Sequence, residues 1–110
     1  MAKLSLLKTE QDFRNFKASK SYQSKVLKIR VHFSANQNHP RFGFIVPKKV
    51  LPKAVDRNLI KRRIKGILQK ISVRPSDVVF YPNKSALKLK ASELRLEVES
   101  ILKIARLWNS

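Results

Sequence analysis

The stretch RFGFIVPKKVLPKAVDRNLIKRRIK, residues 41–65, changes its pattern twice and so sets the framework of the fold. Its first part, 41–46, is rich in aromatic and β-branched residues, which predicts a strand. Pro47 and Pro52 then bracket a short crossover in which neither a strand nor a helix continues easily. From 53 to 71 the apolar residues recur at helical spacing, which predicts an amphipathic helix with Ile60, Ile64, Ile67, Leu68 and Ile71 on its buried face.

Two further strands are predicted on either side of this stretch. Apolar and polar residues alternate over 27–33, which is typical of a strand with one dry face and one wet face. The short link from this strand to 41–46 favours an antiparallel hairpin. After the helix, the run at 78–81 predicts a third strand.

Helices are predicted at both ends of the chain. Thr9 and Asp12 resemble a capping box and predict a helix over 9–18. Near the other end, Ser92 is a favourable N-cap and Glu93 suits the first turn of a last helix. The buried stripe of that helix is predicted to hold Leu94, Val98, Ile101, Leu102, Ala105 and Trp108. The order α-β-β-α-β-α predicts one α+β sandwich domain over 1–110, with helices packed on an open, mostly antiparallel sheet.

Composition places the chain among folded intracellular proteins. Its 110 residues suit one domain, and an apolar content of 43% is too high for a disordered basic tail. The chain has no cysteine, which fits a reducing compartment. Its apolar runs are far shorter than the ~20 residues of a membrane span, and residues 1–8 lack the apolar core of a signal peptide. We therefore expect a soluble cytoplasmic protein without a membrane partner.

The charge of the chain is concentrated in its middle. The net charge is +18, and between Asp12 and Asp77 the sequence has 17 Lys and Arg but one acid, Asp56. At about 100° per residue, a row of polar side chains (Arg57, Asn58, Lys61, Arg62 and Lys65) falls within a sector of about 140° beside the buried face. A solvated helix face is disfavoured because acids do not alternate with these cations to form i,i+4 pairs. A phosphate-binding helix edge in a nucleic-acid-binding domain is the better interpretation.

The segments 41–49 and 54–62 together resemble the signature of the bacterial ribonuclease P protein component, a strand that ends in Lys-Lys followed by a helix that opens with Ala-Val-x-Arg-Asn. The resemblance implies an α-β-β-β-α-β-α fold like that of the second domain of ribosomal protein S5, with a left-handed β-α-β crossover. This order has one strand more than the residue patterns predict, and a short edge strand near 47–51 is a candidate for it. Leu59 and Lys65 stand where the family usually has arginine or another basic residue, and Pro47 replaces a small polar residue.

The resemblance also implies a function. The family's protein is the small subunit of a ribonucleoprotein whose catalytic RNA, with Mg²⁺ bound mainly by that RNA, removes the 5′ leader from precursor tRNA. Transferred by position, the RNA-binding residues would be Lys48, Lys49, Lys53, Arg57, Asn58, Lys61, Arg62 and Lys65. Phe13 and Lys17 would contact the leader in a cleft between the first helix and the sheet. The partners would be the catalytic RNA and precursor tRNA.

Catalytic and metal-binding residues are not expected on the polypeptide itself. A protein-only nuclease needs clustered carboxylates or histidines, whereas His32 and His39 are isolated, with His32 on the wet face of its strand and His39 in a turn. The aromatic residues Phe33, Phe44, Phe80 and Trp108 are assigned to the core. A structural RNA-binding protein, such as a ribosomal protein, remains the alternative function, because it would have the same charge and the same lack of catalytic groups.

Overall fold

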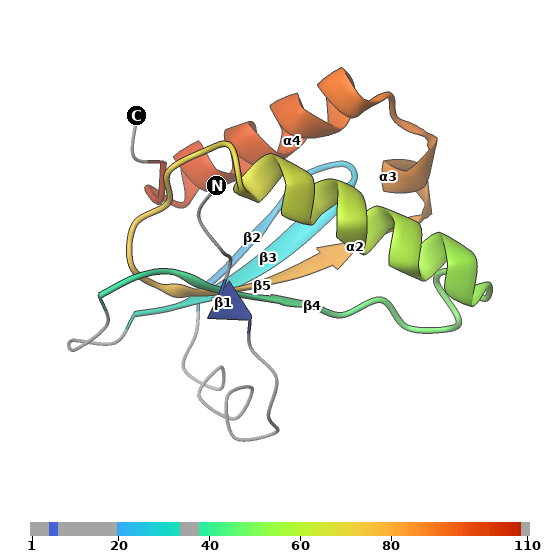
Figure 1. Cartoon of the computed structure of the whole chain (residues 1–110), viewed down its shortest axis with the longest axis horizontal. Coiled ribbons are helices and arrows are strands. Elements are labelled where there is room, and N and C mark those ends of the chain that lie inside the picture. The colour runs from blue at the N-terminus through green and yellow to red at the C-terminus, as the bar shows by residue number, and fades with distance from the viewer. Residues whose placement is uncertain (1–4, 7–19, 34–37, 109–110) are drawn as a thin grey trace.

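The computed structural model describes residues 5–6, 20–33 and 38–108, and in this part of the chain helices cover one face of a five-stranded sheet (Figure 1). The strands are β1 (Ser5–Leu6), β2 (Lys20–Gln23), β3 (Leu27–His32), β4 (Arg41–Phe44) and β5 (Asp77–Pro82), in the spatial order β1-β4-β5-β3-β2. The described helices are α2 (Ala54–Leu68), α3 (Lys84–Lys88) and α4 (Ala91–Ile104). The α+β sandwich is confirmed, while the helix predicted over 9–18 lies outside the described residues.

The antiparallel hairpin predicted between 27–33 and 41–46, which contain β3 and β4, is wrong. Strand β5 lies between β3 and β4, antiparallel to β3 and parallel to β4. The reason is burial, because Val78, Val79 and Phe80 of β5 are all fully buried, as expected for the strand in the middle of the sheet. The short link between β3 and β4 favoured the hairpin. However, β5 is apolar on both of its faces, and it therefore takes the central position between these two strands.

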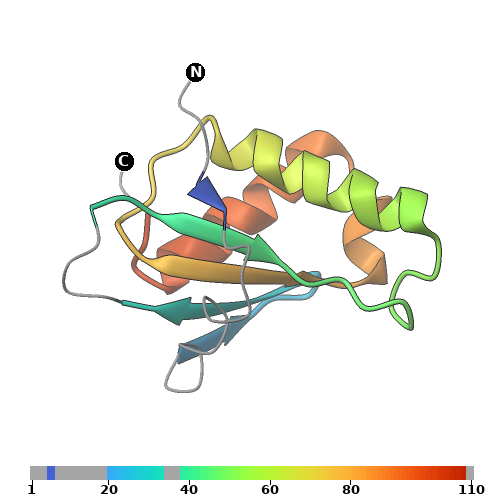
Figure 2. The same ribbon diagram turned by 60° about the horizontal axis from the view of Figure 1, so that its bottom comes forward.

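The connection from β4 through α2 to β5 has the hand that the family resemblance implies. In Figure 2, β4 and β5 point the same way, β5 lies below β4, and α2 crosses behind them, so the crossover is left-handed. Crossovers between parallel strands are right-handed in about 98% of cases, so this geometry is distinctive. It places α2 on the same face of the sheet as α4.

The residue patterns missed two strands, β1 and β2, and residues 47–51 form no strand. The amide N–H groups of Val50 and Leu51 donate to the carbonyl of Pro47 at 3.0 and 3.1 Å, so the crossover begins with a tight turn. Strand β2 pairs with β3 in register from Lys20↔Val31 to Gln23↔Lys28. Its sequence KSYQ is mostly exposed, so it lacks the apolar alternation from which strands are predicted.

The core lies between the sheet and the pair α2 and α4. The predicted buried face of α2 is confirmed for Ile60, Ile64, Ile67 and Leu68, and the stripe of α4 is buried from Leu94 through Ala105. On the sheet, Phe80 is fully buried and its ring stacks on that of Phe44 with centroids 5.7 Å apart. Trp108 is half-buried beyond the end of α4, where it forms an isolated bridge with Val73.

Two local predictions near the ends of elements are wrong. Phe33 is 57% exposed and does not belong to the core. The pairing of β3 with β5 ends at His32↔Asp77, so the alternation in the sequence runs one residue past the sheet. Helix α4 begins one residue before Ser92, with Lys90 at the N-cap, and the Glu93 carboxylate accepts the Lys90 N–H at 2.9 Å.

Candidate nucleic-acid interface

The basic row is defined as Arg57, Asn58, Lys61, Arg62 and Lys65 of α2, and burial of the opposite side of the helix fixes its direction. Because the isoleucine face of α2 packs on the sheet, the row lies along one flank of the helix. Asn58 and Arg62 are exposed, and the other three members are half-buried. The row therefore combines two side chains that extend into solvent with three that are partly packed against the protein.

Arg57 has a second role that sequence reasoning missed. Its Nη1 donates to the backbone carbonyl oxygens of Leu51 at 2.8 Å and Pro52 at 2.9 Å. Both carbonyls belong to the crossover between β4 and α2, so the guanidinium fastens this segment to the first turn of the helix. Contacts between residues five and six apart depend on the path of the crossover, which no local pattern reveals.

The lysines of the crossover lie on the segment that Arg57 fastens. Lys48, Lys49 and Lys53 are exposed, and Lys53 is the N-cap residue of α2 without a side-chain capping bond. The first turn of α2 thus retains backbone N–H groups, which together with the helix dipole favour an anion at this end. The three lysines extend the cationic surface from the row onto the crossover.

Lys65 connects the row to the edge of the core. Its Nζ lies 5.7 Å from the centroid of the Phe44 ring, which itself stacks on Phe80. This cation–π contact directs the row toward the β4 side of the molecule. Lysine in place of arginine keeps the charge here but lacks the bidentate fork.

Two carboxylates of the described residues, those of Asp77 and Glu99, form ion pairs away from the row. Arg41 binds Asp77 through two hydrogen bonds of 2.8 Å, and Arg95 lies 3.7 Å from Glu99. Within residues 5–6, 20–33 and 38–108, neither of these ion pairs involves a member of the row. The charge of the row is therefore available to an external polyanion.

The sheet face opposite the helices carries a second polar surface. On β3, Lys28, Arg30 and His32 alternate with the core residues, so they lie on this opposite face. A cleft of ≈ 240 Å³ at its edge is lined by side chains that include Lys28, Pro47, Val50 and Tyr81, and the Lys28 Nζ lies 5.7 Å from the Tyr81 ring centroid. The cleft therefore connects this face of the sheet to the crossover. Phe13 and Lys17, predicted at the leader, lie outside the described residues.

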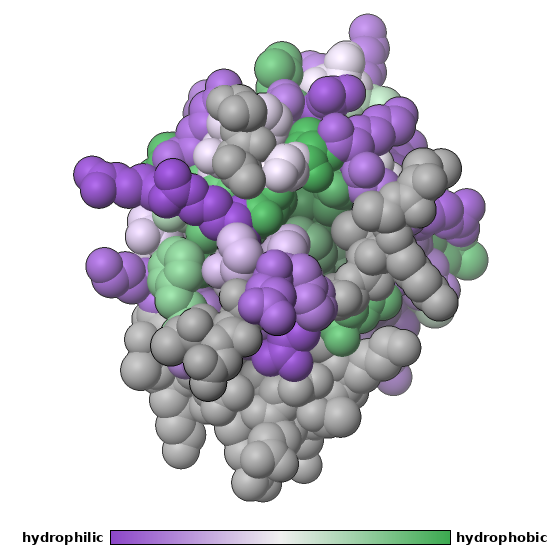
Figure 3. Space-filling model, turned by 60° about the vertical axis from the view of Figure 1, so that its left-hand side comes forward, coloured by the Kyte–Doolittle hydropathy of each residue, from purple (hydrophilic) through white to green (hydrophobic). Residues whose placement is uncertain are grey.

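Hydropathy alone does not single out an interface. At the end of the molecule viewed in Figure 3, hydrophilic side chains project around the rim, and hydrophobic surface shows between them. Within the part of the chain that the structure describes, three or more His, Cys, Asp or Glu side chains do not come together, and no helix is long and apolar enough to cross a membrane. The row is therefore distinguished by the sign and density of its charge.

Comparisons with known proteins agree on one family. The family model for ribonuclease P matches residues 1–106. A ribonuclease P protein component from Streptococcus pyogenes serotype M5 is 33% identical over 110 residues, which cover 97% of this chain and 91% of that protein.

Solved structures give the same result. The Staphylococcus aureus RNase P protein superposes with a TM-score of 0.84 at 26% identity, covering 97% of this chain and 100% of that one. The Thermotoga maritima RNase P protein superposes with a TM-score of 0.78 at 25% identity, covering 91% and 96%. The matched stretch contains the left-handed crossover, the basic row and both lysines of the turn, and the chain belongs to the ribonuclease P protein component family.

Proposed function

We propose that this protein is the RNA-binding subunit of a ribonuclease P ribonucleoprotein and that it grips the catalytic RNA with one continuous cationic interface. The interface consists of the basic row together with Lys48, Lys49 and Lys53. The single observation that carries the proposal is the fastening of the crossover by Arg57, because it joins two cationic segments into one surface. Arginine and lysine in such an arrangement suit phosphate oxygens, and Asn58 adds an amide for a 2′-hydroxyl or a base edge.

In this proposal the RNA cuts the phosphodiester bond and the protein supplies binding. Mg²⁺ in proteins prefers oxygen ligands, usually carboxylates together with phosphates. The proposed interface consists of cations and one amide, which do not fit a metal site. The Mg²⁺ ions of the reaction are therefore assigned to the RNA partner.

The 5′ leader of precursor tRNA is the proposed ligand of the sheet face opposite the helices. A single strand requires cations that follow its backbone and flat groups on which bases stack. Lys28 and Tyr81 supply one of each at the cleft beside Pro47. Phe13 and Lys17 are proposed to complete this contact. The proposed location is the cytoplasm of a bacterial cell, where such precursors are processed.

Reconstitution tests this function directly. The purified protein is added to a bacterial catalytic ribonuclease P RNA at low Mg²⁺, and removal of the 5′ leader from precursor tRNA is measured. We expect stimulation of cleavage and, in the presence of the RNA, tighter binding of precursor tRNA than of mature tRNA. Equal binding of both tRNAs without stimulation would instead indicate a structural RNA-binding protein. Cleavage by the protein alone would also contradict the assignment.

A further inference from the structure

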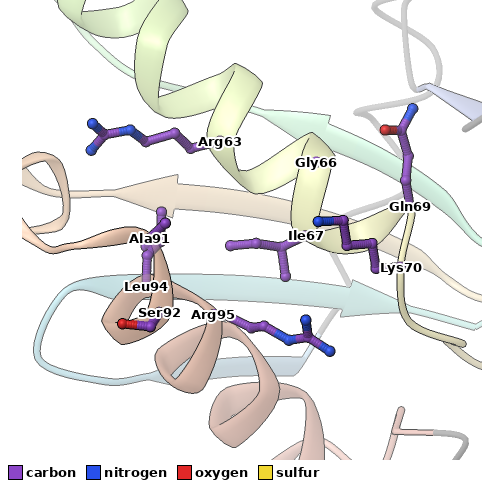
Figure 4. A pocket seen from close by; sticks show the side chains of 9 residues that line it. All are labelled: Arg63, Gly66, Ile67, Gln69, Lys70, Ala91, Ser92, Leu94 and Arg95. Carbon is purple, nitrogen blue, oxygen red and sulfur yellow. The ribbon is translucent and has the colours of Figure 1, made fainter.

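A groove of ≈ 480 Å³ lies between α2 and the beginning of α4 (Figure 4). At about 100° per residue, the α2 residues that line it fall on the flank opposite the basic row. Gly66 and the side chains of Ile67 and Leu94 form its apolar floor, and Figure 4 shows Ile67 directed into the space between the two helices. The groove is therefore a surface distinct from the proposed interface.

Gly66 is the feature of this groove that the fold does not explain. Glycine is among the least favourable residues in the middle of a helix. A Cβ atom built at this position would meet no atom within 4 Å, so the packing of the described residues does not require a glycine. The missing side chain instead leaves the floor of the groove open.

Cations border the groove at both ends. Arg63 lies at one end, and its Nη1 donates to the carbonyl oxygens of Leu87 at 3.3 Å and Leu89 at 3.5 Å, which hold the guanidinium in place. Lys70 and Arg95 lie at the other end.

Few acidic side chains in the described part of the chain lie near these cations to neutralise them. The contact of Arg95 with Glu99 is long, at 3.7 Å, and the Arg95 side chain is 47% exposed. Among the described residues that line the groove there is no acid. Ser92, in the first turn of α4, adds a hydroxyl to the lining.

We propose that this groove binds one unpaired nucleotide, with its base on the floor against the Arg63 guanidinium and its phosphate between Lys70 and Arg95. A guanidinium plane is one of the surfaces on which proteins stack unpaired bases, and ammonium and guanidinium groups are ligands for phosphate. The volume lies in the range of about 300–1,000 Å³ that is typical of pockets for small molecules. An acidic helical peptide would match the charge, but it requires an extended apolar groove. A single nucleotide matches the combination of a short apolar floor and cationic ends.

The test uses the full-length protein labelled with ¹⁵N and follows backbone amide signals by NMR. Three ligands are titrated separately: adenosine monophosphate, an oligoadenylate of six nucleotides, and inorganic phosphate. We expect both nucleotide ligands to shift the signals of Ile67, Ser92 and Leu94, and phosphate alone to bind more weakly. Tighter binding of the oligonucleotide would indicate that the natural ligand is part of an RNA strand, and equal affinity would indicate a free nucleotide.

Two variants make the test specific. Gly66→Ala places a methyl group on the floor and should weaken nucleotide binding by about 10-fold, the lower end of the effect of one methylene group in a hydrophobic pocket, while the melting temperature rises. Lys70→Gln combined with Arg95→Gln should weaken binding by about 10-fold or more, since charge-assisted bonds to phosphate are lost. The matched control, Lys25→Gln combined with Lys84→Gln, loses the same charge at exposed sites away from the groove and should bind as the wild type does.

Several outcomes would overturn the inference. These are equal losses in the groove and control variants, no effect of Gly66→Ala, equal binding of phosphate and nucleotide, or binding of a glutamate-rich helical peptide in preference to nucleotides. The last result would indicate a protein partner. The residues that line the groove do not belong to the proposed RNA interface, so this test can fail without affecting the ribonuclease P proposal.

Discussion

Replacing Arg57 by lysine separates two ways in which this residue can support RNA binding. If Arg57 acts as a point charge toward phosphate, then Arg57→Lys keeps its contribution. If it acts by holding the crossover, the variant loses this contribution, because an ammonium group on a different stem does not place a donor where Nη1 reaches both the Leu51 and Pro52 carbonyls. We expect the second result.

The magnitude follows from these two hydrogen bonds. A buried hydrogen bond to a charged group contributes about 1.5–3 kcal/mol to stability. Because the Arg57 side chain is only half-buried, solvent lowers this contribution. A net loss of about 1–3 kcal/mol corresponds to roughly 5- to 150-fold weaker binding of the catalytic RNA. Since the crossover also loses its anchor, the amide protons of Val50 and Leu51 should exchange faster with solvent.

The assay is the dissociation constant for the catalytic RNA, measured over a series of KCl concentrations. For Arg57→Lys we expect weaker binding at every concentration with an unchanged slope, because the number of cations is the same. The control Lys61→Ala removes a cation and should lower the magnitude of the slope by about 1. Wild-type affinity and wild-type amide exchange in Arg57→Lys would refute the positioning role.

Three further predictions follow from the described contacts. The affinity of the wild type for RNA should fall steeply with salt, with a log–log slope near −4 for about five phosphate contacts, whereas a flat response in the same titration would exclude an electrostatic interface. Arg41→Gln should lower the free energy of unfolding by about 3 kcal/mol, because it breaks an ion pair whose carboxylate, Asp77, is 1% exposed; urea denaturation measures this, and the exposed Arg74→Gln should change it little. Asn83→Ala should cost about 1 kcal/mol in the same assay, since its Oδ1 accepts the N–H groups of Ser85 and Ala86 at the start of α3; a loss no larger than that of Lys84→Ala would count against the cap.

Helix α2 shows what the sequence could predict. Its apolar face and the row beside it follow from periodicity alone, because a 15-residue amphipathic helix gives a strong local signal. The position of α4 followed from the same signal, with its N-cap misplaced by two residues, at Ser92 instead of Lys90. The prediction of nucleic-acid binding needed only the sign and spacing of the charges on α2.

Pairing between strands could not be predicted in this way. The alternation in β3 shows which face is buried, but it does not identify the neighbouring strand, and the short link to β4 suggested the wrong one. Strand β2 is exposed and polar, and it is held by pairing with β3 and by a turn in which the Ser24 Oγ accepts the N–H of Leu27 at 3.2 Å. The Arg41–Asp77 pair was missed for the same reason, since its partners meet only because β4 lies beside β5.

The central claim is that the position of the cations, and not merely their number, creates the RNA interface. The most direct measurement compares two triple variants that lose the same charge, one in the row (Lys61→Gln, Arg62→Gln, Lys65→Gln) and one at exposed sites outside it (Lys25→Gln, Lys84→Gln, Lys88→Gln). We predict that binding of the catalytic RNA weakens by about 100-fold or more in the row variant and changes only slightly in the other. Equal losses in the two folded variants would contradict the claim.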